Sequence, residues 1–200
     1  MSKMDKLLFL AEEYVFKFKT LRSNQLEKLI WSKNHISVNK LRNQIRKIKL
    51  NNNYEYIDDK KIFRDFSVNK YNSEFNIAKF EQSYFKLVDV YIELFMNFKI
   101  IDTKINNYNK ISFLMEEGNK NIAKYNIIYC NPSEQSTLEK SLSILEEEDK
   151  NIIVLNEEVL ENYREFRCEN EKINIVVATA SSKGVMIKKS VEDLIRSYGG

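Results

Sequence analysis

The residues best suited to chemistry in this chain are the cations and amides of residues 37–48. Their apolar neighbours recur at helical spacing, which predicts an amphipathic helix with an inner stripe of Val38, Leu41, Ile45 and Ile48. The opposite face carries no acid and displays Asn39, Lys40, Asn43, Arg46 and Lys47. Arg pairs with guanine and Asn with adenine in the major groove of DNA. This pattern predicts a recognition helix that reads base edges.

The roles of these side chains differ by residue type. We expect Asn39, Asn43 and Arg46 to contact bases, with Ser37 capping the start of the helix. Cations elsewhere on the surface would neutralise phosphates, which gives affinity without sequence information. This second group consists of Lys40 and Lys47 on the helix and Arg22 and Lys33 before it.

The elements around this helix predict a winged helix-turn-helix over residues 1–70. A helix over residues 3–18 precedes a second one that Ser23 would cap and that ends at Trp31. A turn over residues 32–35 then leads to the recognition helix. Residues 54–57 and 61–66 flank a short polar turn and predict a hairpin, the wing. From the wing, Lys60, Lys61 and Arg64 would reach the flanking DNA backbone or minor groove.

The charge distribution separates the same part of the chain from the rest. Residues 1–70 hold 16 Lys or Arg against 8 Asp or Glu, a net charge of +8. Residues 71–200 hold 16 against 21, a net charge of −5. This segregation predicts one module that binds a polyanion and one part with a different task.

Residues 73–100 form the longest predicted helix. Its apolar residues alternate at spacings of three and four over three heptads: Ile77, Phe80, Tyr84, Leu87, Tyr91, Leu94 and Phe98. Two interpretations follow, a core helix that bridges two domains and a helix that mediates dimerisation. The number of aromatic residues favours globular packing over a regular coiled coil.

Beyond residue 105 the pattern predicts strands alternating with helices. Crossover connections of that kind predict a small, mostly parallel sheet. The overall class is therefore α/β, or α+β for the whole chain, with a winged helix at 1–70, a connecting or dimerisation helix at 71–105 and an α/β domain at 106–200. Predicted strands are 111–115, 125–130, 151–155, 173–178 and 185–187, and predicted helices are 132–145, 157–166 and 190–197.

Several function classes are disfavoured by what the sequence lacks. No apolar run is long enough for a membrane span, and one His with two Cys outside any CxxC motif predicts neither a metal site nor a disulfide framework. A metal-dependent nuclease would need an acid-x-Lys on its second strand, and residues 125–130 read YNIIYC. The acids at 116–117 and 157–158 remain candidates for a site or for ordinary helix starts. We expect a cytoplasmic protein without cofactor or catalytic activity.

The layout as a whole resembles the replication-relaxation family of bacterial plasmids and conjugative elements. The resemblance rests on TLRSNQLEKLIW and SVNKLRNQIRKI, on the long helix, and on YNIIYCNP and NIIVLN in the C-terminal part. It implies a DNA-binding accessory protein in the replication, transfer or maintenance of a mobile element. It also implies a nuclease-like C-terminal domain, which the missing acid-x-Lys would make degenerate here.

Two alternatives stay open beside this sequence-specific DNA-binding accessory or regulatory protein. A transcriptional repressor with a ligand-sensing α/β domain should contain a sizeable pocket in that domain. A diverged metal-dependent nuclease should bring two acids together beside a Lys. An adaptor should instead expose an apolar patch. The expected partners are double-stranded DNA, a second copy of the chain in a homodimer, and a protein bound by the C-terminal domain.

Overall fold

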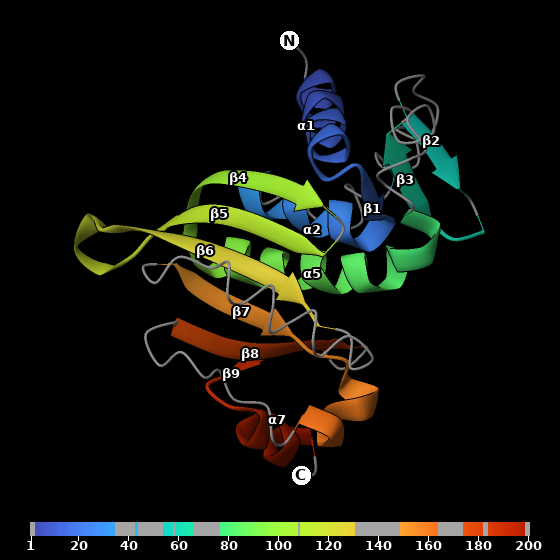
Figure 1. The fold of residues 1–200 in the computed structure, drawn as a ribbon. Helices are drawn as coiled ribbons and strands as arrows, with labels where there is room; N and C mark the ends of the chain where they lie inside the picture. Colours follow the sequence, from blue (N-terminus) through green and yellow to red (C-terminus); the bar gives the residue numbers. More distant parts are fainter. Residues whose placement is uncertain are drawn as a thin grey trace. The chain divides into compact units, whose positions relative to one another are not determined.

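The chain divides into two compact units, Met1–Lys79 and Phe80–Gly200, which are described separately below. The computed structural model describes residues 3–34, 43, 54–57, 59–65, 77–107, 109–130, 149–163, 174–181 and 184–198. Helices and strands are mixed throughout these ranges (Figure 1). The mixed α and β class expected from the sequence is therefore confirmed.

The first unit contains two helices and a three-stranded sheet. Its elements are α1 (Lys3–Phe18), β1 (Thr20–Arg22), α2 (Ser23–Asn34), β2 (Tyr54–Ile57) and β3 (Ile62–Asp65). Helix α1 and the two hairpin strands lie where the sequence predicted them. Helix α2 continues through the predicted turn at 32–35 as far as Asn34, and β1 was not predicted at all.

Strand β3 lies in the middle of this sheet and pairs antiparallel with both β1 and β2. The residue before β1 and the residue before β3 are both lysines in the left-handed region, Lys19 with φ 64° and Lys61 with φ 53°. The carbonyl oxygen of Lys19 accepts the backbone N–H of Asp65, the last residue of β3, at 2.8 Å, and that of Lys61 accepts the N–H of Ser23, directly after β1, at 2.9 Å. These two bonds close the β1–β3 pair at both ends.

The core of the first unit forms where α1 and α2 cover this sheet. Phe63 on β3 is fully buried, and its ring contacts those of Tyr54, at 5.6 Å between centroids, and Tyr56, at 4.7 Å. Helix α1 contributes a buried apolar stripe of Leu7, Ala11, Tyr14, Val15 and Phe18. Aromatic contacts of this kind add to the stability that apolar burial already provides.

The second unit is built on a six-stranded sheet. Most of the long helix α5 (Ile77–Asn97) belongs to it, and the strands run in the order β4-β5-β6-β7-β8-β9. These strands are β4 (Lys99–Asn107), β5 (Lys110–Glu116), β6 (Ile122–Tyr129), β7 (Lys150–Val154), β8 (Asn174–Ser181) and β9 (Gly184–Lys188). The short helices are η1 (Gly118–Lys120), η3 (Glu157–Tyr163) and α7 (Val191–Tyr198).

The prediction of a mostly parallel sheet was wrong. Only β6–β7 and β7–β8 are parallel, whereas β4–β5, β5–β6 and β8–β9 are antiparallel. The physical reason is the length of the connections, because links as short as that from Glu116 to Ile122 allow an antiparallel turn but no crossover. Strand β4 had also been assigned partly to the end of the predicted helix over 73–100. The predicted helix over 132–145 lies outside the described residues.

The two faces of the large sheet carry different cores. On the α5 face, Tyr91 contacts Phe113 edge-on at 5.8 Å, and Phe113 stacks on Tyr125 at 5.4 Å. Burial raises the pKa of Tyr91 to about 12, and its hydroxyl lies 2.8 Å from that of Thr103. The other face carries an apolar row of Ile128, Ile153 and Val177, covered by side chains of η3 and α7.

A row of polar side chains runs beside that apolar row. Ser112 donates to the amide oxygen of Asn126 at 2.7 Å, and the amide nitrogen of Asn126 donates to Asp149 at 2.9 Å and Asn151 at 3.1 Å. Lys124 forms an ion pair with the same Asp149 carboxylate at 2.8 Å. Asn126 and Asn151 are almost completely buried. Because a one-residue slip would move these groups to the opposite face, the polar row specifies the register of β5, β6 and β7.

Strand β4 forms one edge of the sheet and is irregular along its length. Its pairing with β5 shifts register between Ile100 and Asp102 and again between Ile105 and Asn107. The carboxylate of Asp102 accepts the backbone N–H of Thr103 at 2.7 Å. Bulges and side-chain bonds of this kind are features by which natural sheets protect their edges.

We predict that Asn126→Ala lowers the free energy of unfolding by about 2–4 kcal/mol. The substitution leaves the buried Asp149 carboxylate, the Ser112 hydroxyl and Asn151 without their shared partner, and each unsatisfied buried group is costly. Urea denaturation would measure the change. The matched control is Asn97→Ala, an exposed amide bonded to Glu93 at the end of α5, which should cost less than about 0.5 kcal/mol. Equal losses in the two variants would contradict the role assigned to the polar row.

Candidate nucleic-acid interface

The start of α2 is fastened to the turn of the β2–β3 hairpin. Both the backbone N–H and the hydroxyl of Ser23 donate to the carbonyl oxygen of Lys61, each at 2.9 Å. Ser23 is the first residue of the helix and not the N-cap that the sequence predicted, and its hydroxyl donates across to the hairpin. Gln25 reaches back instead and accepts the backbone N–H of Arg22 at 3.0 Å, as the third helical residue does in a capping box.

A cavity of about 370 Å³ lies at this junction. Three cations and one acid line it, together with two polar residues of the first helical turn: Arg22, Lys60, Lys61, Glu27, Ser23 and Asn24. The start of a helix carries a partial positive charge and backbone N–H groups without helical partners. The combination of these cations with a helix start favours an anion, and phosphate is the anion that such sites bind most readily.

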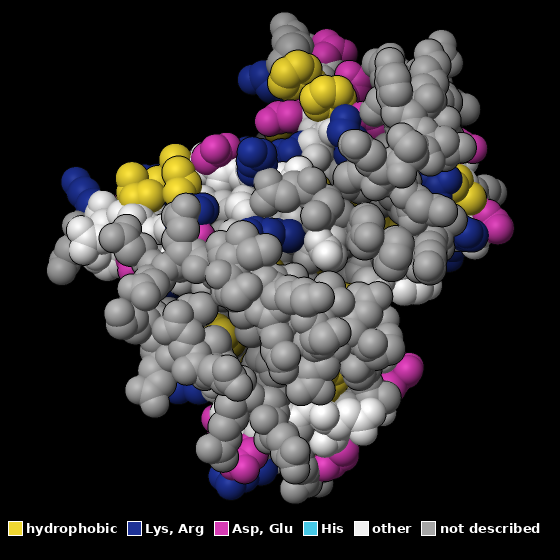
Figure 2. Space-filling view, in the orientation of Figure 1, with side chains coloured by type: hydrophobic (Ala, Val, Ile, Leu, Met, Phe, Trp, Pro, Cys, Tyr) yellow, Lys and Arg dark blue, Asp and Glu magenta, His cyan; other side chains and the backbone are white. Residues whose placement is uncertain are grey.

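The hairpin turn holds its lysines outward because the residues after them are anchored. Ile62 is 4% exposed and Phe63 is fully buried, so the strand is fixed directly after the turn. Lys60 and Lys61 are exposed, and so is the acid that precedes them, Asp59. Figure 2 shows cations at this hairpin with an acidic side chain close by. The predicted wing lysines are therefore available to a partner from solvent.

The structure brings together some of the predicted site residues and separates others. Arg22, Lys60 and Lys61 line the one cavity, although they come from both sides of the sequence. Lys33 lies at the far end of α2, roughly 15 Å along the helix axis, with its ammonium 5.7 Å from the centre of the Tyr14 ring. Arg64 is half-buried on the central strand, opposite Thr20 and Glu55.

The predicted recognition helix can be assessed at one position. Asn43 is helical and exposed, as its predicted role requires. The other residues assigned to that helix, Ser37, Asn39, Lys40, Arg46 and Lys47, lie outside the described residues. Sequence reasoning missed Ser23 and Asn24 as members of the cavity, although their position at a helix start beside Arg22 was a usable signal.

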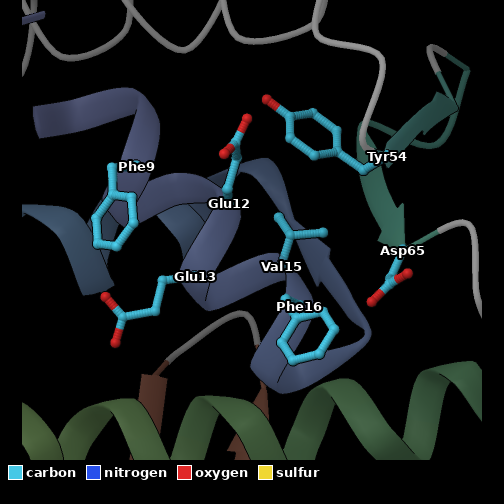
Figure 3. Close-up of a pocket in the computed structure, with 7 residues that line it drawn as sticks. All are labelled: Phe9, Glu12, Glu13, Val15, Phe16, Tyr54 and Asp65. Carbon is cyan, nitrogen blue, oxygen red and sulfur yellow. The ribbon is translucent and has the colours of Figure 1, made fainter. Parts of the chain in front are cut away.

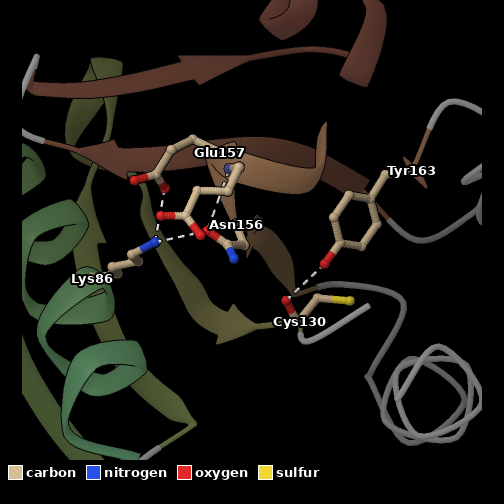
Figure 4. A network of polar contacts seen from close by, with 6 residues as sticks. Lys86, Cys130, Asn156, Glu157 and Tyr163 are labelled. Atoms are coloured by element: carbon tan, nitrogen blue, oxygen red, sulfur yellow. Dashed lines mark hydrogen bonds and ion pairs between the residues drawn. The ribbon is translucent and has the colours of Figure 1, made fainter. Parts of the chain in front are cut away.

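Acids and bases also meet in two polar clusters of the second unit. At the carboxyl end of β7, Lys86 of α5 bonds to Asn156 at 3.0 Å and to Glu157 at 2.8 Å (Figure 4). Nearby, the Tyr163 hydroxyl donates to the carbonyl oxygen of Cys130 at 3.2 Å. Glu157 therefore begins η3 and pairs with a cation of α5 that the sequence pattern did not connect to it.

The second cluster joins Glu117, Tyr125 and Lys150 on the α5 face. The Glu117 carboxylate accepts hydrogen bonds from both the Lys150 ammonium and the Tyr125 hydroxyl. The bond from Lys150 lowers the pKa of Glu117, and the same bond raises the pKa of Lys150. Burial raises the pKa of Tyr125. All three shifts hold the cluster as an ion pair with a neutral phenol, an arrangement that stabilises the sheet.

Metal ligands and membrane spans can be examined over the same ranges. Among the described residues, no three side chains of His, Cys, Asp and Glu gather as the ligands of a metal ion would. The helices in this part of the chain include none with the length and apolar character of a bilayer span. No protein-family model and no curated protein matches the sequence.

We predict that the Glu117–Lys150 pair contributes stability only between the two shifted pKa values. Because the pKa of Glu117 is lowered, its contribution is complete above the ordinary value of 4.5 and is lost as pH falls through the folded-state value. Because the pKa of Lys150 is raised, its contribution is complete below 10.5 and is lost at more alkaline pH.

Urea denaturation of wild type, Glu117→Gln, Lys150→Met and the double variant would measure this contribution. At pH 7 the coupling free energy should be about 1 kcal/mol or less, as for other partly exposed pairs. It should disappear once the pH falls below the lowered pKa of the Glu117 carboxyl. A coupling that stays constant as the pH is lowered until the carboxyl is protonated would show that the contact is not ionic.

Proposed function

We propose that this chain binds double-stranded DNA through its first 70 residues and acts as an accessory or regulatory protein. The observation that carries the proposal is the basic cavity at the start of α2, fastened to the hairpin turn by two bonds to the Lys61 carbonyl. Arg22, Lys60 and Lys61 meet a helix start there, in the part of the chain with a net charge of +8. A DNA phosphate is the ligand that this surface fits best.

A winged-helix arrangement is part of the same proposal. It is supported by the order α1, β1, α2, β2, β3 and by a sheet in which β3 lies between β1 and β2. The predicted recognition helix falls between α2 and β2 in the chain, as that arrangement requires. The hairpin turn and the start of α2 would then hold phosphates while the recognition helix reads bases through Asn39, Asn43 and Arg46.

The biological setting and the assembly are proposed on the sequence evidence. The resemblance to the replication-relaxation family favours a role in replication, transfer or maintenance of a mobile element. A homodimer would place two recognition helices on paired half-sites, the usual arrangement for helix-turn-helix proteins. The second unit would recruit a protein partner.

We predict that the two turn lysines each account for about one released counterion in DNA binding. In Lys60→Gln/Lys61→Asn, the slope of log K against log salt should fall by about 1.8. Asn is chosen at 61 because it tolerates the left-handed backbone there. Fluorescence anisotropy on a labelled duplex across a salt series would measure the slope.

The matched control for this experiment is Lys6→Gln/Lys104→Gln. It removes two exposed lysines, one on α1 and one on β4, and changes the net charge by the same amount. Its slope should stay close to that of wild type. Equal slopes in the two double variants would show that net charge, and not the cavity, governs DNA binding.

We predict that Asn43→Ala relaxes sequence discrimination without a comparable loss of non-specific affinity. An Asn that pairs with adenine provides about 1–3 kcal/mol of discrimination at that base pair. Selection of binding sites from random duplexes, followed by titration of the selected site and its single-base variants, would measure the change. An unaltered site preference in the variant would remove Asn43 from the base-reading set.

A further inference from the structure

The first unit contains a second cavity that differs in chemistry from the basic one. It measures about 340 Å³ and lies between α1 and the open end of the β2–β3 hairpin (Figure 3). Three aromatic side chains line it, Phe9, Phe16 and Tyr54. Three carboxylates line it as well, Glu12, Glu13 and Asp65, and none of its lining residues is a cation. This acidic aromatic pocket lies within a segment whose net charge is positive.

The pocket presents its apolar side chains to solvent. Phe9 is 61% exposed and Phe16 is 68% exposed, even though the buried apolar residues of α1 are their near neighbours on the same helix. Val15, which is 1% exposed, closes the pocket toward the core of the unit. In Figure 3 the Glu12 carboxylate points toward the Tyr54 hydroxyl, and Glu13 lies beside Phe9. Exposed aromatic side chains grouped around a cavity mark a binding surface.

The rim of the pocket already holds one ammonium group of the chain itself. The Nζ of Lys19 lies 4.0 Å from the centre of the Phe16 ring and 3.0 Å from Oδ2 of Asp65. A cation placed over an aromatic face and beside a carboxylate gains from both contacts. An ammonium group therefore fits between an aromatic ring and a carboxylate at this rim, and Glu12 and Glu13 add two further carboxylates to the lining.

A second copy of the chain does not fit this surface through α1. Two α1 helices related by a twofold axis perpendicular to them would run antiparallel, with Phe9 of one copy near Phe16 of the other. The same geometry places Glu12 and Glu13 of one helix against Glu13 and Glu12 of its mate. Four carboxylates at the centre of an interface repel one another, and such contacts are the ones that specific interfaces avoid.

We propose that the acidic aromatic pocket binds a segment of a partner protein that carries an apolar side chain flanked by Lys or Arg. The apolar side chain fills the space between Phe9, Phe16 and Val15, and the flanking cations pair with Glu12 and Glu13. Anchors of this kind in small pockets supply most of the affinity of a peptide interface.

The position of the pocket leaves the basic cavity accessible. The pocket lies at the Tyr54–Asp65 end of the hairpin and the basic cavity at the end that follows Ile57 and precedes Ile62. Strands of this length separate the two by about 13 Å. The pocket can therefore be occupied independently of a ligand at the hairpin turn, and the proposal stands whether or not that ligand is DNA.

The test uses the full chain and four labelled twelve-residue peptides. The first has one Leu flanked by Arg on both sides, the second has Ser in place of Leu, the third has Glu in place of Arg, and the fourth carries both changes. Anisotropy titrations should give saturable binding for the first peptide and at least about tenfold weaker binding for the others. Methyl NMR should show shifts of the Val15 resonances on addition of the first peptide.

Two variants locate the binding. Glu12→Lys/Glu13→Lys should weaken the first peptide by about tenfold, whereas Glu158→Lys/Glu192→Lys, which makes the same charge change at two exposed acids of the second unit, should leave it unchanged. Phe16→Ser should weaken binding of the first peptide without altering the net charge of the protein. Thermal melts of each variant would show that the fold is retained.

Three results would overturn the proposal. Equal affinity for the Leu and Ser peptides would show that the apolar walls take no part. Equal losses of affinity in the two charge-reversal variants would show that peptide binding depends on net charge and not on the pocket. A dimer that dissociates on Phe16→Ser in sedimentation experiments would assign the surface to a second copy of the chain.

Discussion

The antiparallel pair of β1 and β3 is the contact on which the candidate DNA-binding surface depends. The two strands are short and far apart in the chain, so closing the loop between them costs conformational entropy. Hydrogen bonds to the carbonyl oxygens of Lys19 and Lys61 secure both ends of the pair, and the fully buried side chain of Phe63 anchors β3 in the core. Only this pairing brings Arg22 beside the hairpin lysines, because nothing in the local sequence would do so.

The second unit is ordered by a different constraint, the adjacency of a polar and an apolar row. Ile128, Ile153 and Val177 align across three strands, and two residues away Asn126 bonds to both of its neighbouring strands. Burial of the apolar row stabilises the sheet but would tolerate small shifts of the strands, whereas the hydrogen bonds of the Asn126 amide can form in one strand register alone. Together they explain how β6 and β7 pair in parallel although one joins an antiparallel meander.

Elements with a regular spacing of apolar residues could be predicted from the sequence, whereas contacts between segments far apart in the chain could not. The helix over about 3–18 and the strand over 54–57 were predicted over the ranges that the structure describes, because their apolar residues recur at regular spacing. Strand β1 has only three residues, which is too short for an alternating apolar pattern, and it forms because it pairs with β3. Strand β4 follows the long helix without a break, and its alternating charges hide it. The basic side of the candidate site was predictable from charge, but the bonds from Ser23 to Lys61 and the acidic aromatic pocket required the fold.

The irregular edge strand β4 sets a limit on how this protein can assemble. A neighbouring chain that approached this edge would meet a strand twisted by two register shifts, with the N–H of Thr103 already occupied by Asp102. Growth of the sheet from molecule to molecule, the first step toward fibrils, is therefore hindered on this side. At this edge an oligomer would instead have to form through packing of side chains, which allows a closed assembly of defined size.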